Sequence, residues 1–408
     1  MEFHKHTLPN GLEIVAECNA EARSTALGFF VQAGSRDESD DVAGVSHFLE
    51  HMVFKGTPTR SADDVNREFD AMGASNNAFT SEEHTVYYAS VLPEYQTDAL
   101  RLLGDMMRPA LREEDFNTEK QVIVEEIRMY EDQPPFGADD KIKAAYFGRH
   151  PLARSVLGTV DSITGLKVDA MRNYFQRRYS PANMALVATG RVDFEALVTA
   201  TVEVCGDWRP FPTGRELPAA SGQAGLRCLY KPSATLEYVL QLSSGPHAAD
   251  SRRHAAKILA TVLGDDSGSR LYWELVDTGL AEQVSLSHYD YQGVGLFMTY
   301  MTCEAEAAAE NLERIAKIYR VAEATGITPA ELAQAKSKIK SRVVLSSERP
   351  RGRLFNVGGN WLQRHTYRTV EEDLRAFDAV TIDDVAGLLA EFPLSRAMVM
   401  AVGPLTEM

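Results

Sequence analysis

Cysteine and long apolar runs are both scarce in this sequence. Only 4 cysteines occur among 408 residues, far apart and with no Cys-x-x-Cys pair, so neither a cysteine zinc site nor a dithiol redox motif is visible. This usage favours a reducing compartment. No stretch reaches the roughly 18 apolar residues that a membrane-spanning helix needs, so we expect no membrane insertion.

Positive charge is also in short supply. The 42 Lys and Arg residues face 58 Asp and Glu residues, which gives a formal net charge of −16. An acidic field disfavours phosphate backbones and anionic lipid surfaces, so we expect neither nucleic acid nor a membrane as a partner. Residues 1–7 have no apolar segment and are not rich in Arg and Ser. We therefore expect no signal or transit peptide, and a cytoplasmic protein.

Apolar material, by contrast, is plentiful. Hydrophobic residues make up 44% of the chain, which is ordinary for a globular protein. At this length they can form a core that needs no metal or disulfide to hold it together. Any bound metal is therefore expected to be catalytic rather than structural.

The chain also resembles itself at a shift of about 214 residues. Residues 182–190 (ANMALVATG) match residues 396–403 (RAMVMAVG), and a helical segment precedes both. A Pro- and Gly-rich stretch separates the copies. We predict an α+β protein of two homologous halves, each a mixed sheet with helices packed on it. The predicted division is 1–210, a linker at 211–224, and 225–408.

Two histidines lie four residues apart in the apolar, helically spaced segment 44–56. On a helix, His47 and His51 would share one face, a turn apart, and could bind one metal ion. Glu50 would lie beside that ion, free to act as a general base on a water whose pKa the metal lowers. The same five-residue pattern also arises by chance among ordinary histidines, so the motif alone leaves both interpretations open.

A catalytic zinc site needs a third protein ligand. The helix predicted at residues 113–131 offers Glu119, Glu125 and Glu126. Glu119 and Glu126 are seven residues apart and share a face, with apolar residues between them, whereas Glu125 lies about 100° round from Glu126. A carboxylate on an apolar face needs a partner, and a metal would satisfy Glu126 with Glu119 behind it. Solvated surface glutamates are the alternative.

The segment 47–57 (HFLEHMVFKGT) resembles the signature of the pitrilysin/insulinase family of inverted zinc peptidases. The resemblance is strongest to bacterial members of similar length and to the β subunit of mitochondrial processing peptidase. The family's Glu-(six residues)-Glu pattern is matched by Glu119 and Glu126, which implies Glu126 as the third zinc ligand and Glu119 as an accessory catalytic acid. The family also implies metallopeptidase-like α/β rolls facing each other around a chamber.

A substrate-binding edge strand after the metal helix is a further implication of the resemblance. The segment 73–80 (GASNNAFT) matches it, which implies that Asn77, Ala78 and Phe79 contact an extended peptide added to the sheet edge. A turn at Asn76 and Asn77 before a core strand is the alternative.

The second half departs from the family pattern. Active members carry an Arg shortly before a Gly-Leu-Ala sequence and a Tyr directly after it, and both reach the substrate near the zinc. Here Val276 and Glu282 occupy those places. Neither side chain can donate a hydrogen bond to an oxyanion at neutral pH. The chain is therefore expected to be a weaker catalyst than its relatives, or to work with a second subunit that supplies Arg and Tyr.

These observations together predict a zinc metalloendopeptidase that cleaves unfolded peptides or short protein segments. We expect His47, His51 and Glu126 to bind Zn²⁺ and Glu50 to act as the general base. We expect the zinc-bearing subunit of a heterodimer, with a homodimer as the alternative. A weak or inactive scaffold subunit of the same fold, and a specialised peptidase acting on a cofactor-precursor peptide, are the rival functions.

Overall fold

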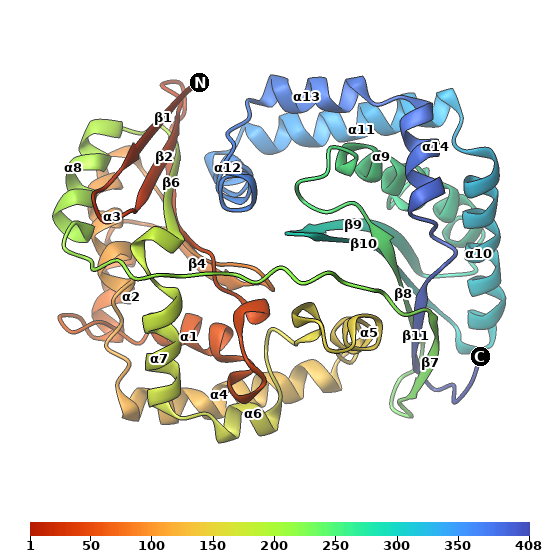
Figure 1. Cartoon of the computed structure of the whole chain (residues 1–408), viewed down its shortest axis with the longest axis horizontal. Coiled ribbons are helices and arrows are strands. Elements are labelled where there is room, and N and C mark those ends of the chain that lie inside the picture. The colour runs from red at the N-terminus through yellow and green to blue at the C-terminus, as the bar shows by residue number, and fades with distance from the viewer. The chain divides into compact units, whose positions relative to one another are not determined.

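The computed structural model describes residues 1–408 and contains two separate β-sheets, each with its own helices (Figure 1). The chain divides into two units, and it enters each of them three times. The first unit comprises Met1–Arg128, Arg154–Glu216 and Leu345–Arg368, and the second comprises Met129–Ala153, Leu217–Val344 and Thr369–Met408. The predicted α+β class is confirmed.

The first sheet has six strands in the order β1-β2-β6-β3-β5-β4. Neighbouring strands are antiparallel except for the parallel pair β2 and β6. Their bounds are β1 Glu2–Thr7, β2 Glu13–Cys18, β3 Thr25–Val31, β4 Ser75–Thr80, β5 Thr85–Val91 and β6 Met184–Gly190. Strand β4 is an edge strand, and it contains Asn76 and Asn77. The alternative of a turn at these two residues is therefore wrong.

Both faces of this sheet are covered, as the fully buried strand β3 shows. Side chains alternate along a strand, so Leu27 and Phe29 enter one core while Ala26 and Phe30 enter another. The first core receives most helices of the unit. These helices are α1 Val45–Val53, α2 Ala62–Ala71, α3 Gln96–Met106, α4 Glu113–Asp132, α6 Val160–Gly165, α7 Val168–Arg178 and α8 Phe194–Cys205.

The opposite face of the first sheet is covered by α12 (Pro350–Arg364), a helix from the C-terminal part of the chain. Arg353 donates from Nε to Glu17 Oε1 at 2.8 Å, and both side chains are buried. Gly358 permits close packing, because a Cβ there would lie 2.3 Å from the Phe30 ring. The helix is thus fixed to the sheet by a buried ion pair and by tight packing.

The second sheet has five strands in the order β7-β11-β8-β10-β9, of which β7 and β11 are parallel. Its strands are β7 Gly225–Tyr230, β8 Glu237–Gly245, β9 Gln283–Tyr291, β10 Val294–Cys303 and β11 Met398–Gly403. This order repeats β2-β6-β3-β5-β4 of the first sheet, strand for strand and direction for direction. The two halves are therefore copies of one topology, as the internal repeat predicts.

The helices of the second unit are α5 Ala138–Phe147, α9 Arg253–Gly264, α10 Ala308–Thr325, α11 Pro329–Ser347, α13 Val370–Ala379 and α14 Ile382–Glu391. Helix α5 comes from the N-terminal part of the chain and packs in the core against β8 and β11. No helix combines the length and the apolar character that a membrane crossing requires.

The units differ from the predicted contiguous division 1–210 and 225–408 by two exchanged segments. Residues 129–153, with α5, lie in the second unit, and residues 345–368, with α12, lie in the first. The boundary between Glu216 and Leu217 falls within the predicted linker 211–224, which has no helix or strand. The exchange has no local signature, because an amphipathic helix does not specify which sheet it will cover.

Candidate metal centre

Helix α1 is held at its N-terminus by a buried carboxylate. Glu38 accepts hydrogen bonds from the backbone N–H groups of Gly44 and Ser46, each at 2.7 Å. Gly44 adopts a left-handed conformation with φ of +89°, and a Cβ there would lie 2.5 Å from the Leu157 carbonyl oxygen. Burial raises the pKa of Glu38 to about 8, although its backbone hydrogen bonds oppose the rise. These contacts fix the N-terminus of the helix that carries His47, Glu50 and His51.

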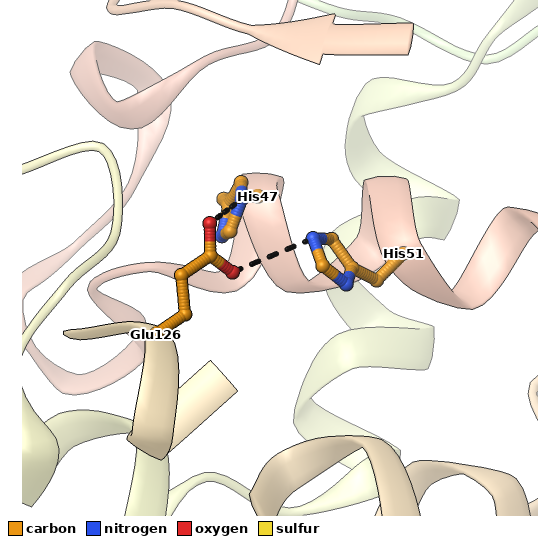
Figure 2. Close-up of side chains that lie close together, drawn as sticks. All are labelled: His47, His51 and Glu126. Atoms are coloured by element: carbon orange, nitrogen blue, oxygen red, sulfur yellow. Dashed lines mark ion pairs between the residues drawn. The ribbon is translucent and has the colours of Figure 1, made fainter. Parts of the chain in front are cut away.

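Two side chains of α1 and one of α4 converge, as Figure 2 shows. His47 Nε2 lies 3.8 Å from Glu126 Oε1, and His51 Nε2 lies 3.7 Å from Glu126 Oε2. One ligand atom from each residue lies within 4.8 Å of the other two. Zinc bonds of about 2.0–2.2 Å place tetrahedral ligand atoms roughly 3.3–3.6 Å apart. The three donors would therefore have to approach one another by up to roughly 1 Å to bind one zinc ion.

His47 has the protonation state that a metal ligand needs. Its side chain is buried, and burial, with a smaller contribution from nearby His51, lowers the pKa of His47 to about 4. The ring is thus neutral at pH 7, with a lone pair available. Its Nδ1 is buried and has no hydrogen-bond partner, so Nε2, which faces Glu126, is the nitrogen placed to bind a metal.

His51 is oriented by a second carboxylate. Its Nδ1 lies 3.0 Å from Glu119 Oε1, and Lys55 Nζ lies 2.5 Å from Glu119 Oε2. Burial alone would lower the pKa of His51, but the hydrogen bond to Glu119 and the nearby carboxylates raise it overall. Burial likewise opposes ionisation of Glu119, yet His51 and Lys55 hold its pKa below the ordinary value. Ionised Glu119 therefore fixes Nδ1 and turns Nε2 towards the metal position.

Glu50 lies on the same helix as His47 and His51 but is not one of the three donors. Its Oε2 accepts a hydrogen bond from Thr80 Oγ1 at 2.6 Å. Burial raises the pKa of Glu50, against the lowering effects of Thr80 and His51, and the charge of Glu126 adds to the rise. A carboxylate with a raised pKa beside a metal position is suited to proton transfer.

Strand β4 presents the predicted peptide-binding residues at the open edge of the sheet. Ala78 is buried in the core that contains α1, whereas Asn77 and Phe79 lie on the opposite face of the strand. The Phe79 ring lies 5.7 Å from that of Phe355 in α12. Ala78 N–H donates to Asn77 Oδ1 at 2.9 Å, so an incoming strand would have to displace this amide to reach the Ala78 N–H.

The remaining predicted residues lie outside this cluster. Glu125 is exposed and pairs with Arg128 at 2.6 Å, so it is no ligand. In the second unit, Val276 ends the short π-helical segment Tyr272–Val276 and packs partly buried against the apolar core. Glu282 is exposed and precedes β9, and its backbone N–H donates to Thr302 O at 2.9 Å. Neither position carries a side-chain donor.

Two residues that contact the centre were not identified from the sequence. Lys55 lies four residues after His51, a spacing that brings side chains together on or just beyond a helix. Thr80 shares the buried face of β4 with Ala78, and a polar side chain on a buried face signals a partner. Both sequence features predict that the side chain has a partner, but neither feature identifies the carboxylate that it contacts.

The fold and the site together define the class of protein: a duplicated α+β protein whose first half carries an inverted His-x-x-Glu-His sequence on helix α1. Comparison with known families gives the particular assignment, because the chain belongs to peptidase family M16. The model described as Insulinase (Peptidase family M16) matches residues 13–160, and that of the Peptidase M16 inactive domain matches residues 165–339. The predicted pitrilysin/insulinase resemblance is confirmed.

Individual relatives cover nearly the whole chain. An uncharacterized zinc protease of Mycobacterium bovis is 34% identical over 98% of this chain and 92% of its own length. A probable mitochondrial-processing peptidase β subunit of Arabidopsis thaliana is 27% identical over 98% of this chain and 78% of its own. The crystal structure of a protease from Helicobacter pylori shares the fold, with a TM-score of 0.92, 21% identity and 99% coverage of both chains.

Proposed function

We infer that this protein is a zinc-dependent endopeptidase that hydrolyses unfolded peptides or short protein segments. The observation that carries the inference is the convergence of His47, His51 and Glu126 on one point, with Glu50 beside them. Homologues named zinc proteases support the choice of metal. A cytoplasmic location stays a prediction from the sequence.

The residues divide the work of hydrolysis among them. His47, His51 and Glu126 would hold zinc, which, when bound, supplies Lewis-acid polarisation of the scissile carbonyl and of the attacking water. Glu50 accepts a proton from that water and delivers it to the leaving amine nitrogen. Glu119 keeps the His51 ring oriented through Nδ1. Strand β4 binds the peptide by backbone hydrogen bonds, which demand little of the side-chain sequence.

The chain would act as the zinc-bearing subunit of a heterodimer, and this part of the proposal rests on two residues. Val276 and Glu282 stand where active relatives carry the Arg and Tyr that reach the substrate. Losing a single oxyanion donor typically lowers kcat by about 100- to 1,000-fold. A second subunit that supplies both donors would compensate for this loss, whereas a second copy of this chain, with the same Val276 and Glu282, would not.

The test is cleavage of a fluorogenic peptide by the purified chain loaded with zinc, with zinc per chain measured in parallel. We expect one zinc per chain, and cleavage that Glu50→Gln abolishes without loss of zinc. Glu125→Gln is the matched control, since it makes the same chemical change on the neighbouring helix outside the centre. Failure of the wild-type chain to bind zinc at His47, His51 and Glu126 would overturn the metallopeptidase assignment.

The rate of peptide cleavage distinguishes a chain that is active alone from one that needs a second subunit. A kcat/KM above about 10⁴ M⁻¹s⁻¹ for the chain alone is within the ordinary enzyme range and would refute the need for a second subunit. If the chain bound one zinc ion but cleaved no peptide, even with a candidate partner that carries Arg and Tyr, the scaffold function would be favoured. Val276 and Glu282 are the residues that support this alternative.

A further inference from the structure

We propose that Thr80 is the positioning residue for Glu50: its hydroxyl orients the general base and ties it to the edge strand that would receive the peptide. The proposal rests on the peptidase function above. The observation is the 2.6 Å hydrogen bond from Thr80 Oγ1 to Glu50 Oε2, which joins the last residue of β4 to α1. Nothing in the metal motif specifies this contact.

The direction of the hydrogen bond follows from counting protons. A threonine hydroxyl donates one. Thr80 Oγ1 also lies 3.3 Å from Thr85 Oγ1, but Thr85 donates its own proton to the Ala33 carbonyl oxygen at 2.9 Å. The carboxylate of Glu50 is closer to Thr80 than Thr85 is, and it is the charged acceptor. Thr80 therefore donates its hydroxyl proton to Glu50, and the length of this hydrogen bond is typical of one to a charged acceptor.

The consequence for catalysis lies in the two oxygens of Glu50. Oε2 is occupied by Thr80, whereas Oε1 has no hydrogen bond within the chain. The carboxylate thus offers one free oxygen in a fixed direction for proton transfer. Without the hydroxyl, the carboxylate would be buried with no donor and free to rotate, including towards the neighbouring metal position.

Strand geometry links the base to the peptide as well. Thr80 and Ala78 point to the same face of β4, and Ala78 is packed in the core with residues of α1, so the strand cannot shift independently of the metal helix. A peptide added to the open edge would lie about 4.8 Å from β4. One six-residue strand would then set both the path of the peptide backbone and the position of Glu50.

The decisive variants are Thr80→Val, which removes the hydroxyl while keeping the shape, and Thr80→Ser, which keeps the hydroxyl. Thr85→Val is the control, because it removes a buried hydroxyl of the same cluster that does not touch Glu50. The measurements are kcat and KM on a fluorogenic peptide, zinc affinity by chelator competition, and peptide affinity in a Glu50→Gln background.

We expect Thr80→Val to lower kcat by roughly 10- to 100-fold, because a displacement of about 1 Å in a catalytic group has an effect of this size. KM, peptide affinity and zinc affinity should stay within about threefold of wild type, and Thr80→Ser should recover most of kcat. An undiminished kcat in Thr80→Val, an equal loss in Thr80→Ser or Thr85→Val, or a parallel loss of zinc would overturn the proposal.

A double-mutant cycle on thermal unfolding of the metal-free protein tests the contact without any turnover. Thr80→Val and Glu50→Ala, each of which removes the hydrogen bond, should be non-additive, with a coupling of about threefold or more in the unfolding equilibrium constant, as is typical of residues in contact. If the two effects were additive and the wild-type chain cleaved peptides, the role of Thr80 would be refuted but the peptidase function would stand. A wild-type chain that binds no zinc and cleaves nothing would instead refute the proposed function.

Discussion

Replacing Glu119 by Gln should weaken zinc binding, and the structure indicates by how much. The carboxylate is nearly buried, with its side chain 6% exposed, and it makes only two contacts, to His51 Nδ1 and to Lys55 Nζ. The Gln amide can still accept a hydrogen bond from His51, so the ring keeps a partner but loses the charge that raises its basicity. Loss of such a partner typically weakens metal affinity by about 10- to 100-fold, or roughly 1.4–2.7 kcal/mol.

The pH dependence of this loss has a definite sign. In the metal-free protein, Glu119 helps to raise the pKa of His51, and zinc must displace the proton that His51 binds below that pKa. As the pH decreases, the zinc affinity of the wild type therefore begins to fall at a higher pH than that of the variant, in which the pKa of His51 is lower. The difference between the two proteins should be largest above neutral pH and should shrink towards pH 6.

Chelator competition at several pH values measures both effects. Glu125→Gln is the control, since its side chain is 69% exposed and pairs only with Arg128 on the surface; such pairs contribute little. We expect the control to bind zinc within about twofold of wild type. If Glu119→Gln also stayed within about threefold at pH 8, Glu119 would not be an orienting residue for the metal ligand.

Two further predictions concern stability. Glu331 is hydrogen-bonded by Arg270 and by the backbone of Thr328, and these bonds lower its pKa to about 2. A lowered folded-state pKa stabilises the protein above the unfolded pKa of about 4.5 and not below the folded one. Glu331→Gln should thus lower the free energy of unfolding by about 1–2 kcal/mol at pH 7. In urea titrations the difference between variant and wild type should disappear as the pH falls from about 4.5 to 2, and a difference that stayed constant would contradict the lowered pKa of Glu331. In α12, Gly358→Ala should destabilise by about 1–3 kcal/mol because the new Cβ meets the Phe30 ring, whereas Gly359→Ala, with open space, should stabilise by up to about 1 kcal/mol. Equal melting temperatures for these two variants would show that α12 does not pack as described.

The arrangement of the candidate metal ligands could be predicted from the sequence because it is mostly local. His47 and His51 are placed by the period of a single helix, and Glu119 and Glu126 by the period of another. Only the meeting of the two helices required further knowledge, which the family resemblance supplied. Helical phase places Glu119 and Glu126 on one face and Glu125 away from it, and the family resemblance supplied the choice of Glu126 as ligand. In the structure Glu125 faces solvent.

Contacts between elements far apart in the chain were harder to predict from the sequence. Thr80 and Lys55 each bind a carboxylate of the centre, yet a strand pattern or a lysine after a helix does not name its partner. The exchange of α5 and α12 between the units is a stronger case. Each reads as an ordinary helix within its own half, and only the completed sheets show which surface it covers.

The exchange also makes the first unit depend on a helix from the C-terminal part of the chain. The face of the first sheet opposite α1 is lined by side chains such as Val15, Phe30 and Val187, and α12 is what buries them. The first sheet therefore needs residues 350–364 of the second half to bury this face. Val276 and Glu282 lie outside α12, so changes at these positions leave the cover of the sheet intact. A chain that ended before α12 would therefore leave this face of the first sheet uncovered.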